Sequence, residues 1–215
     1  MIRSFVSRSG RITASQKKAR EKLWCQYGIN LDKKVLKLEQ IFGRSNPKHL
    51  EIGFGMGDAL ISMAKNNPEH DFLGIDVYNP GIGHLLIELE AAQLTNVKVI
   101  CADAVEILTD YLPLESLDCV YIFFPDPWPK KRHHKRRLIQ TEFLKLLATV
   151  MKLDSELYIA TDWQNYAEHI NEVLETTPLF NGGFADRPDI RRLTKFEQRG
   201  LKLGHKVWDF KFHKK

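Results

Sequence analysis

The sequence predicts an α/β fold, a mostly parallel sheet with helices on both faces. From about residue 49 onward, short apolar segments alternate with segments of helical character. The apolar segments are nearly continuous, which is typical of parallel strands that are buried on both faces. The 215 residues, 43% hydrophobic and 27% charged, are enough for one sizeable core of ordinary composition.

Two helical segments precede the first strand. Residues 15–27 can form a helix whose apolar end docks on the rest of the protein, and the apolar spacing in residues 33–42 predicts a short amphipathic helix. The first of these belongs to a basic N-terminal arm. We expect residues 1–30 to form this arm, flexible or partly helical, and residues 31–215 to form one domain.

The alternation of strands and helices then begins. Strands are predicted where the sequence is apolar, at residues 49–52, 72–77, 97–100, 119–124 and 157–160. Helices are predicted between and after them, at residues 58–66, 82–93, 104–108, 139–151 and 165–175. The pattern changes after Phe184, and residues 206–212 alternate apolar and polar side chains as an edge strand does.

Positive charge is concentrated in three segments. Residues 1–22 hold seven Lys or Arg and one acid, residues 130–137 hold six and none, and residues 187–215 hold ten and three. The chain has a net charge of +5, so everything outside these segments carries −14. An acidic body with three basic segments indicates a polyanion site assembled from distant parts of the chain. The alternative is three solvated surface runs without a common partner.

Several classes of protein are disfavoured. No apolar run approaches the ~18 residues of a membrane span, and the N-terminus lacks the apolar centre of a secretory signal. Its basic, Ser-containing composition leaves an organellar transit peptide open. Cys25, Cys101 and Cys119 form no C-x-x-C pair, which favours reduced thiols over a disulfide scaffold or a zinc site. We expect a cytoplasmic protein without metal or membrane contact.

A glycine-rich loop follows the strand at residues 49–52. Its G-x-G-x-G spacing differs from the G-x-G-x-x-G fingerprint of dinucleotide sites, and an acid precedes it. This short form suits a nucleoside without pyrophosphate, such as S-adenosylmethionine. Asp76 ends the next strand, where an acid can accept hydrogen bonds from ribose hydroxyls, and Asp103 follows the third strand, where it could accept from an adenine amino group. The alternative is that the glycines only make a tight turn and the acids cap helices.

The segment 122–137 joins an acid to a basic belt. Asp126 follows the fourth predicted strand and therefore lies beside the same ligand site. The prolines at 125, 127 and 129 fix three φ angles and bias their predecessors away from helix, so the bend should hold Asp126 in one place. Trp128 can form a wall or stack on a base, and residues 130–137 can hold phosphates. The alternative is a turn aspartate satisfied by backbone N–H groups.

In these motifs the chain resembles the bacterial tRNA (guanine-N7)-methyltransferase family. The resemblance covers nearly the whole chain, and the Pro-Asp-Pro-Trp-Pro-Lys-Lys-Arg-His run is its most specific part. The matching segments are Glu51 to Gly57, Gly74 to Val77 with Pro80 to Gly83, Phe124 to Arg137, Thr161 to Trp163, Thr194 to Gly200, and Leu203 to His205. Asp76 departs from the family, which usually has Glu at this position, and is one methylene shorter.

The resemblance implies a fold and residue roles. The fold is the class I methyltransferase fold, Rossmann-like, with seven strands and a C-terminal antiparallel edge. The cofactor, S-adenosylmethionine, would be bound by Glu51, Gly53, Gly55, Gly57, Asp76, Asp103 and Asp126, with Asp126 also catalytic. The target nucleotide, guanosine 46 of the tRNA variable loop, would be bound by Lys130, Asp162, Thr194, Lys195, Phe196 and Glu197. The tRNA would be contacted by Arg132, His133, His134, Lys135, Arg136 and Arg137.

The chemistry of guanine N7 suggests what these residues do. N7 has a lone pair and no proton, so no base is needed, and Asp126 would orient the guanine and stabilise its growing positive charge. Asp162 and Glu197 could accept hydrogen bonds from N1–H and the exocyclic amine, and Thr194 could supply a hydroxyl. Asp162 could instead cap a helix, and Thr194 to Glu197 could be a capping box.

Two other functions remain open from the sequence. An oxidoreductase that uses a dinucleotide would need a different glycine spacing, and cofactor titration would identify it. An RNA-binding protein without catalysis would not need Asp126 or the glycine loop, and a methyl-incorporation assay would identify it. We expect tRNA as the partner, no obligate protein partner, and a monomer or homodimer.

Overall fold

The computed structural model describes residues 10–32, 34–188, 191, 197, 204 and 206–215. The roles expected of Thr194, Lys195 and Phe196 lie outside these residues, as does the N-terminal part of the arm. The strands are β1 (Lys48–Ile52), β2 (Asp71–Asp76), β3 (Val97–Cys101), β4 (Leu117–Phe123), β5 (Met151–Thr161), β6 (Phe180–Ala185) and β7 (Trp208–Lys214). The helices are α1 (Ala14–Tyr27), α2 (Leu38–Phe42), α3 (Asp58–Asn66), α4 (Asn79–Ala91), α5 (Ala104–Asp110), the 3₁₀ helix η1 (Lys131–Arg136), α6 (Thr141–Val150) and α7 (Gln164–Glu175).

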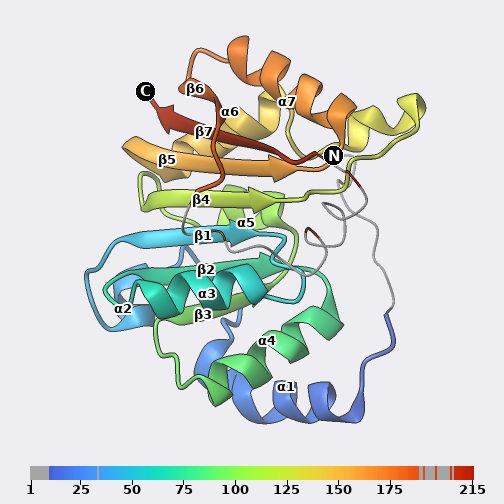
Figure 1. Ribbon diagram of the computed structural model, residues 1–215. Coiled ribbons are helices and arrows are strands. Elements are labelled where there is room, and N and C mark those ends of the chain that lie inside the picture. Colours follow the sequence, from blue (N-terminus) through green and yellow to red (C-terminus); the bar gives the residue numbers. More distant parts are fainter. Residues whose placement is uncertain (1–9, 33, 189–190, 192–196, 198–203, 205) are drawn as a thin grey trace.

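The strands form one seven-stranded sheet in the order β3-β2-β1-β4-β5-β7-β6 (Figure 1). The first five strands pair in parallel, and β7 pairs antiparallel with both β5 and β6. Because the five parallel strands point the same way, their carboxyl ends meet at one edge of the sheet. The order reverses between β1 and β4, where ligands of such sheets bind.

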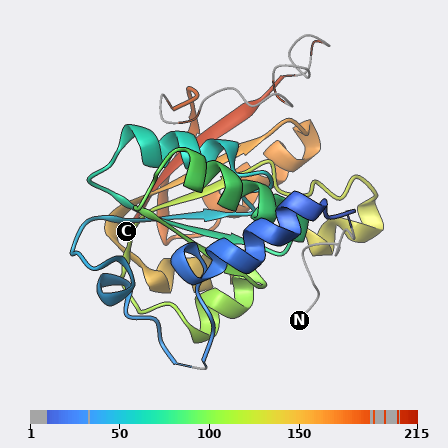
Figure 2. The ribbon, with the colours of Figure 1, turned by 90° about the horizontal axis from the view of Figure 1, so that it is seen from below.

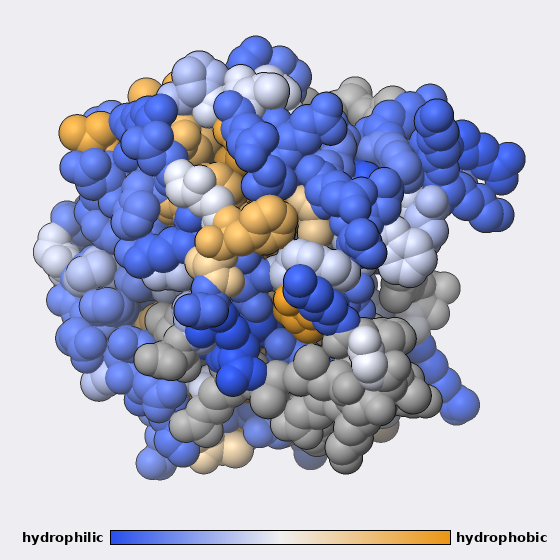
Figure 3. All heavy atoms as spheres, turned by 45° about the horizontal axis from the view of Figure 1, so that its top comes forward, coloured by the Kyte–Doolittle hydropathy of each residue, from blue (hydrophilic) through white to orange (hydrophobic). Residues whose placement is uncertain are grey.

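Helices cover both faces of the sheet, and the side chains divide accordingly. Along β4, Val120 and Ile122 belong to a buried cluster that includes side chains of α5, α6 and α7. Their neighbours Tyr121 and Phe123 belong to a second buried cluster, with side chains of α1, α3 and α4. This alternation follows from the two-residue period of a strand. The face shown in Figure 3 is mostly hydrophilic, with a smaller apolar area near its centre.

The predicted fold class is confirmed, with its antiparallel edge at the C-terminal end of the chain. That edge contains two strands, and β6, which the sequence did not indicate, is the outermost. Gly182 lies so close to β7 that a Cβ there would be 2.1 Å from the carbonyl oxygen of Lys211. Only glycine permits this approach, and the apolar pattern that normally predicts a strand is lost.

The α-helices agree with the prediction apart from α2, and the 3₁₀ helix η1 was not predicted. α1 begins with a capping box, in which Thr13 and Gln16 bond to each other's backbone N–H. It crosses beneath α4, as Figures 1 and 2 both show, and buries Leu23 and Tyr27 there. The helix predicted at 33–42 was too long, because α2 begins only at Leu38. Before it, the N–H of Leu36 donates to the carbonyl of Tyr111, so this part of the chain is tied to the loop after α5.

Candidate active site

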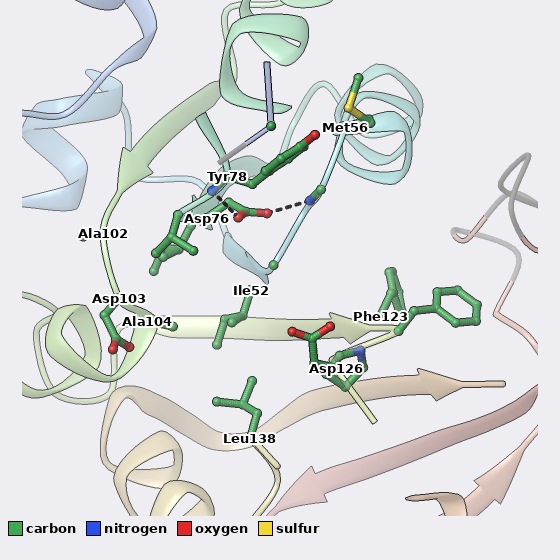
Figure 4. A pocket seen from close by; sticks show the side chains of 17 residues that line it. Ile52, Met56, Asp76, Tyr78, Ala102, Asp103, Ala104, Phe123, Asp126 and Leu138 are labelled. Carbon is green, nitrogen blue, oxygen red and sulfur yellow. Dashed lines mark hydrogen bonds between the residues drawn. The ribbon is translucent and has the colours of Figure 1, made fainter. Parts of the chain in front are cut away.

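A cavity of about 750 Å³ opens at the carboxyl ends of β1 to β4, and Figure 4 shows its lining. This volume is in the range of a binding pocket for a small molecule or cofactor, ~300–1,000 Å³. The lining comes from the glycine loop after β1 and from the segments that follow β2, β3 and β4. Asp103 and Asp126 lie toward opposite ends of the pocket, with Ile52 and Leu138 between them (Figure 4).

The glycine loop is a cradle open to the pocket. Gly53 and Gly55 have φ angles of 76° and 58°, and a Cβ on either would meet no atom within 4 Å. Side chains there would therefore be strained and would project into open space. The loop packs closely against α4, since a Cβ on Gly81 would lie 1.9 Å from the carbonyl oxygen of Gly55. Gly57 caps α3 and does not line the pocket.

Asp76 holds this loop in place. Its carboxylate accepts hydrogen bonds from the N–H of Gly55 at 2.7 Å and from the N–H of Tyr78 at 2.8 Å, the two dashed lines in Figure 4. Burial raises the pKa of Asp76, the two N–H donors oppose this rise, and the charge of Asp126 adds to it. Each carboxylate oxygen keeps a lone pair, so Asp76 can still accept from a ligand hydroxyl.

Glu51 is the most perturbed group of the site. It is 2% exposed and does not line the pocket, and its Oε2 has no hydrogen-bond partner among the described residues. Burial, followed by the charge of Asp76, raises the pKa of Glu51 to about 8. A buried carboxyl with an unused oxygen and a raised pKa is typical of a functional site. The acidic character of the pocket, which favours a cationic ligand, comes instead from the carboxyl groups that line it, those of Asp76, Asp103 and Asp126.

Asp103 lines the pocket and also caps a helix. Its carboxylate accepts from the N–H of Val105 at 2.9 Å at the start of α5. The capping alternative is therefore correct for Asp103. Capping is compatible with ligand contact, because Asp103 lines the pocket and its second carboxylate oxygen can still accept a hydrogen bond.

Asp126 lies on a corner whose backbone is strained at both ends. Phe124 and Trp128 have φ angles of 51° and 47°, in the left-handed region that bulky residues avoid. Both precede prolines, which exclude the right-handed helical conformation at these positions. Such strain costs on the order of 1–3 kcal/mol per residue and persists only where the surroundings hold it. Asp126 lies between these two residues and lines the pocket, so the surroundings that hold the corner also fix the position of Asp126.

Asp162 lies at the same edge, after the neighbouring strand. β4 and β5 pair in parallel with Phe123 opposite Ala160, so Asp126 and Asp162 follow adjacent strand ends. The capping alternative for Asp162 is wrong, because α7 has Trp163 as its N-cap residue and no side-chain cap. Lys130 is exposed and precedes η1 as its N-cap residue, where its carbonyl accepts from the N–H of His133 at 2.7 Å.

The basic belt forms η1, which projects from the body of the protein (yellow, Figures 1 and 2). Arg132 and Lys135 are exposed, whereas Arg136 is half-buried with its guanidinium 4.9 Å from the ring centre of Trp128. The ring of His133 meets Trp128 edge-on. Trp128 thus serves as a wall for the belt. His134, within η1, is also half-buried.

Arg137, for which the resemblance implies a contact with tRNA, differs from the rest of the belt in being buried. It is 2% exposed, and its guanidinium is surrounded by acceptors of the protein itself. Its Nε donates to the carbonyl of Pro127 at 3.0 Å, and its NH1 and NH2 groups donate to Asn165. Its positive charge is therefore directed inward, away from a phosphate.

A second buried arginine lies on the other side of the corner. Arg191 is 1% exposed and lies over the rings of Phe123 and Phe124. It donates to both carboxylate oxygens of Asp209 at 3.1 and 2.9 Å, and to Glu197 at 2.5 Å. Glu197 is thus held at a fixed place beside the pocket wall. The sequence motifs did not indicate Arg191, since burial cannot be seen among neighbouring arginines.

Two further features could have pointed to other functions. Among the described residues, no group of three or more His, Cys, Asp or Glu side chains is arranged to hold a metal ion. Within the same ranges, no helix has the length and apolarity that crossing a bilayer requires.

Comparison with known proteins gives consistent results. Residues 45–210 match a family model described as "Putative methyltransferase". The chain is 53% identical over 217 residues to a tRNA (guanine-N(7)-)-methyltransferase of Nitrosospira multiformis, covering all of this chain and 95% of the relative. It is 49% identical to one of Vibrio cholerae, covering 99% of this chain and 92% of the relative.

Solved structures share the fold at low sequence identity. An antibiotic-related methyltransferase has a TM-score of 0.58 at 19% identity, covering 87% of this chain and 95% of that one. The 16S rRNA methyltransferase KamB has a TM-score of 0.57 at 15% identity, covering 100% and 99%. At these identities the likeness supports the fold alone, and the full-length relatives indicate the family.

Proposed function

The chain belongs to the family of tRNA (guanine-N7)-methyltransferases, and from this premise we propose how its residues perform the reaction. It is an enzyme that uses S-adenosylmethionine to methylate N7 of guanine in tRNA. We propose that the target is guanosine 46 of the variable loop. The observation that carries the proposal is the position of Asp126, on a strained corner between the pocket and the basic belt.

The pocket fits the cofactor. S-adenosylmethionine supplies a methyl group bound to a positively charged sulfur. The acidic lining suits this cation, and the glycine loop leaves open the space that side chains would fill. Asp76 would accept from ribose hydroxyls while it holds the loop, and Asp103 would accept from the adenine amine. Glu51, buried beside the pocket, would offer the oxygen that now lacks a partner.

Asp126 would act on the guanine through its position and charge. N7 carries a lone pair and no proton, so no residue has to remove one. The guanine ring becomes positive as the methyl arrives, and a fixed carboxylate stabilises that charge without reorganising. The contacts that hold the strained backbone at Phe124 and Trp128 also keep Asp126 from rotating away.

Selection of guanine would come from acceptors beside Asp126. Guanine presents an N1–H donor where adenine presents an acceptor, so a carboxylate at this position favours guanine. We propose Asp162 for this contact, with Glu197 as a second acceptor whose position Arg191 fixes. Lys130 would contact the nucleotide from the start of η1. The neighbouring Thr194, Lys195 and Phe196 stay in the proposed set on the family resemblance.

The exposed part of the belt would bind the tRNA backbone. Arg132, Lys135 and Arg136 can contact phosphates, and His133 and His134 line the same segment. Desolvation and the neighbouring cations lower the pKa of His133, which disfavours a positive charge on this side chain. We place the protein in the cytoplasm, because tRNA and reduced thiols belong to that compartment. We propose that it acts as a monomer or homodimer.

A transcript pair tests the proposed target. Unmodified tRNA with guanosine at position 46 is incubated with the enzyme and labelled S-adenosylmethionine, beside the same transcript with adenosine there. We expect methyl incorporation into the first transcript only. Equal incorporation into both would place the target elsewhere, and no incorporation into either would refute the proposed function.

A further inference from the structure

Arg137 touches two loops that end adjacent strands. The loop after β4 contributes the carbonyl of Pro127, directly after Asp126. The loop after β5 leads from Asp162 into α7 and contributes Asn165, whose carbonyl lies 3.3 Å from NH1 and whose Oδ1 lies 2.7 Å from NH2. One guanidinium therefore connects the segments that carry the two acids of the proposed site.

The surroundings of Arg137 leave it little freedom. Its NH2 group also lies 3.2 Å from Nε2 of His134, and its guanidinium carbon lies 4.8 Å from the ring centre of Tyr166. Tyr166 is fully buried, and its hydroxyl accepts from the N–H of Ile139 at 3.2 Å. The arginine thus lies on a rigid floor, and the planar fork of donors matches acceptors in three directions.

The bond to Pro127 acts where the backbone is strained. The carbonyl of Pro127 belongs to the peptide plane that sets the φ angle of Trp128, which is 47°. A peptide plane held by a buried charged donor cannot rotate to relieve this strain, and such charge-assisted bonds are stronger than neutral ones. Asp126 is one residue before this plane, joined to it through Pro127. Loss of the bond would let the corner relax and Asp126 move.

We propose that Arg137 is a positioning residue, which fixes Asp126 relative to Asp162 and makes no contact with tRNA. This inference rests on the proposed function, since it assigns the two acids their roles. Of the six residues for which the resemblance implies a contact with tRNA, the five from Arg132 to Arg136 keep that role and Arg137 holds the corner. Misplacement of a reacting group by about 1 Å can cost on the order of 100-fold in rate.

Arg137→Lys tests the proposal because it keeps the charge and removes the fork. We expect the single-turnover rate at saturating tRNA and cofactor to fall on the order of 10- to 100-fold. The Kd for tRNA and the dependence of binding on salt should stay as in the wild type. Arg132→Ala is the matched comparison, and its effect should lie in binding, with weaker tRNA affinity and a flatter salt dependence.

A second pair of variants covers the case in which Arg137→Lys unfolds. Asn165→Leu removes the side-chain acceptor for Arg137, whereas Asn165→Asp retains it. We expect the first to lose rate on the order of threefold to tenfold at unchanged tRNA affinity, and the second to stay near wild type. The inference is overturned if Arg137→Lys keeps its rate, if its loss lies in tRNA affinity and salt dependence, or if the Asn165 variants behave alike. Failure of the wild-type enzyme to methylate tRNA would instead refute the proposed function.

Discussion

Glu51→Gln should remove a pH-dependent loss of stability from the cofactor-free protein. Glu51 is 2% exposed, and its pKa is raised to about 8 from an ordinary 4.5. A carboxyl whose folded-state pKa is raised keeps its proton in the folded protein after the unfolded chain has lost it. Stability therefore falls as the pH rises from about 4.5 to about 8, and below 4.5 the group has no effect.

The size of the effect follows from the two pKa values. Their difference corresponds to ~5 kcal/mol in total, at about 1.4 kcal/mol for each pH unit between them. Glutamine has nearly the same shape and does not ionise, so the variant should gain stability over the wild type steadily from pH 5 to pH 8. The unused oxygen of Glu51 makes the substitution tolerable, since no bond to that atom is lost.

Urea unfolding without cofactor at pH 5, 6, 7 and 8 measures this difference. Glu142→Gln is the control, because that side chain is 84% exposed on α6 and its replacement should follow the wild-type curve. Parallel curves for Glu51→Gln and wild type across this range would refute the reasoning. They would mean that water reaches the Glu51 carboxyl and that its burial does not raise its pKa.

Three further predictions concern the site and the belt. Asp126→Asn keeps the shape and removes the charge, and we expect its single-turnover rate to fall on the order of 100-fold or more with tRNA affinity within about twofold; a near-normal rate would contradict the catalytic role. Gly81→Ala would place a Cβ 1.9 Å from the carbonyl oxygen of Gly55, so calorimetry should show cofactor affinity reduced by at least about tenfold, while Gly183→Ala, which meets open space, should bind normally. Changing Arg132, Lys135 and Arg136 together to Ala should weaken tRNA binding and flatten its logarithmic salt dependence by about one unit per lost phosphate contact; an unchanged slope would show that the belt does not meet phosphates.

Most of the fold could be predicted because its elements follow local rules. Continuous apolar runs gave five of the seven strand positions, and the glycine loop marked the start of α3. β6 could not be predicted, since its pairing depends on close approach at Gly182 to a strand that follows more than 20 residues later. Its exposed side chains have no apolar alternation, and tertiary contact determines the strand.

The site was predictable where chemistry requires a residue type. An acid at a strand end and glycines in a tight loop are visible in the sequence, and the structure brings Asp76, Asp103 and Asp126 around one pocket. Burial was not visible. In the sequence, Arg137 is one more basic residue after a run of Lys, Arg and His. Only the fold reveals that its donors face Pro127 and Asn165. The rigidity of the corner was predicted from its three prolines. The strained, positive φ angles, however, occur at Phe124 and Trp128, the residues that precede two of these prolines.

Identification of the methylated nucleotide tests the central claim most directly. tRNA treated with the enzyme and S-adenosylmethionine is digested for nucleoside mass spectrometry, and a second portion is reduced and cleaved with aniline to locate 7-methylguanosine. We predict 7-methylguanosine as the product, with one cleavage at position 46, and none with Asp126→Asn under the same conditions. A methyl group on another atom or base would contradict the account, as would unchanged cleavage with the Asp126 variant.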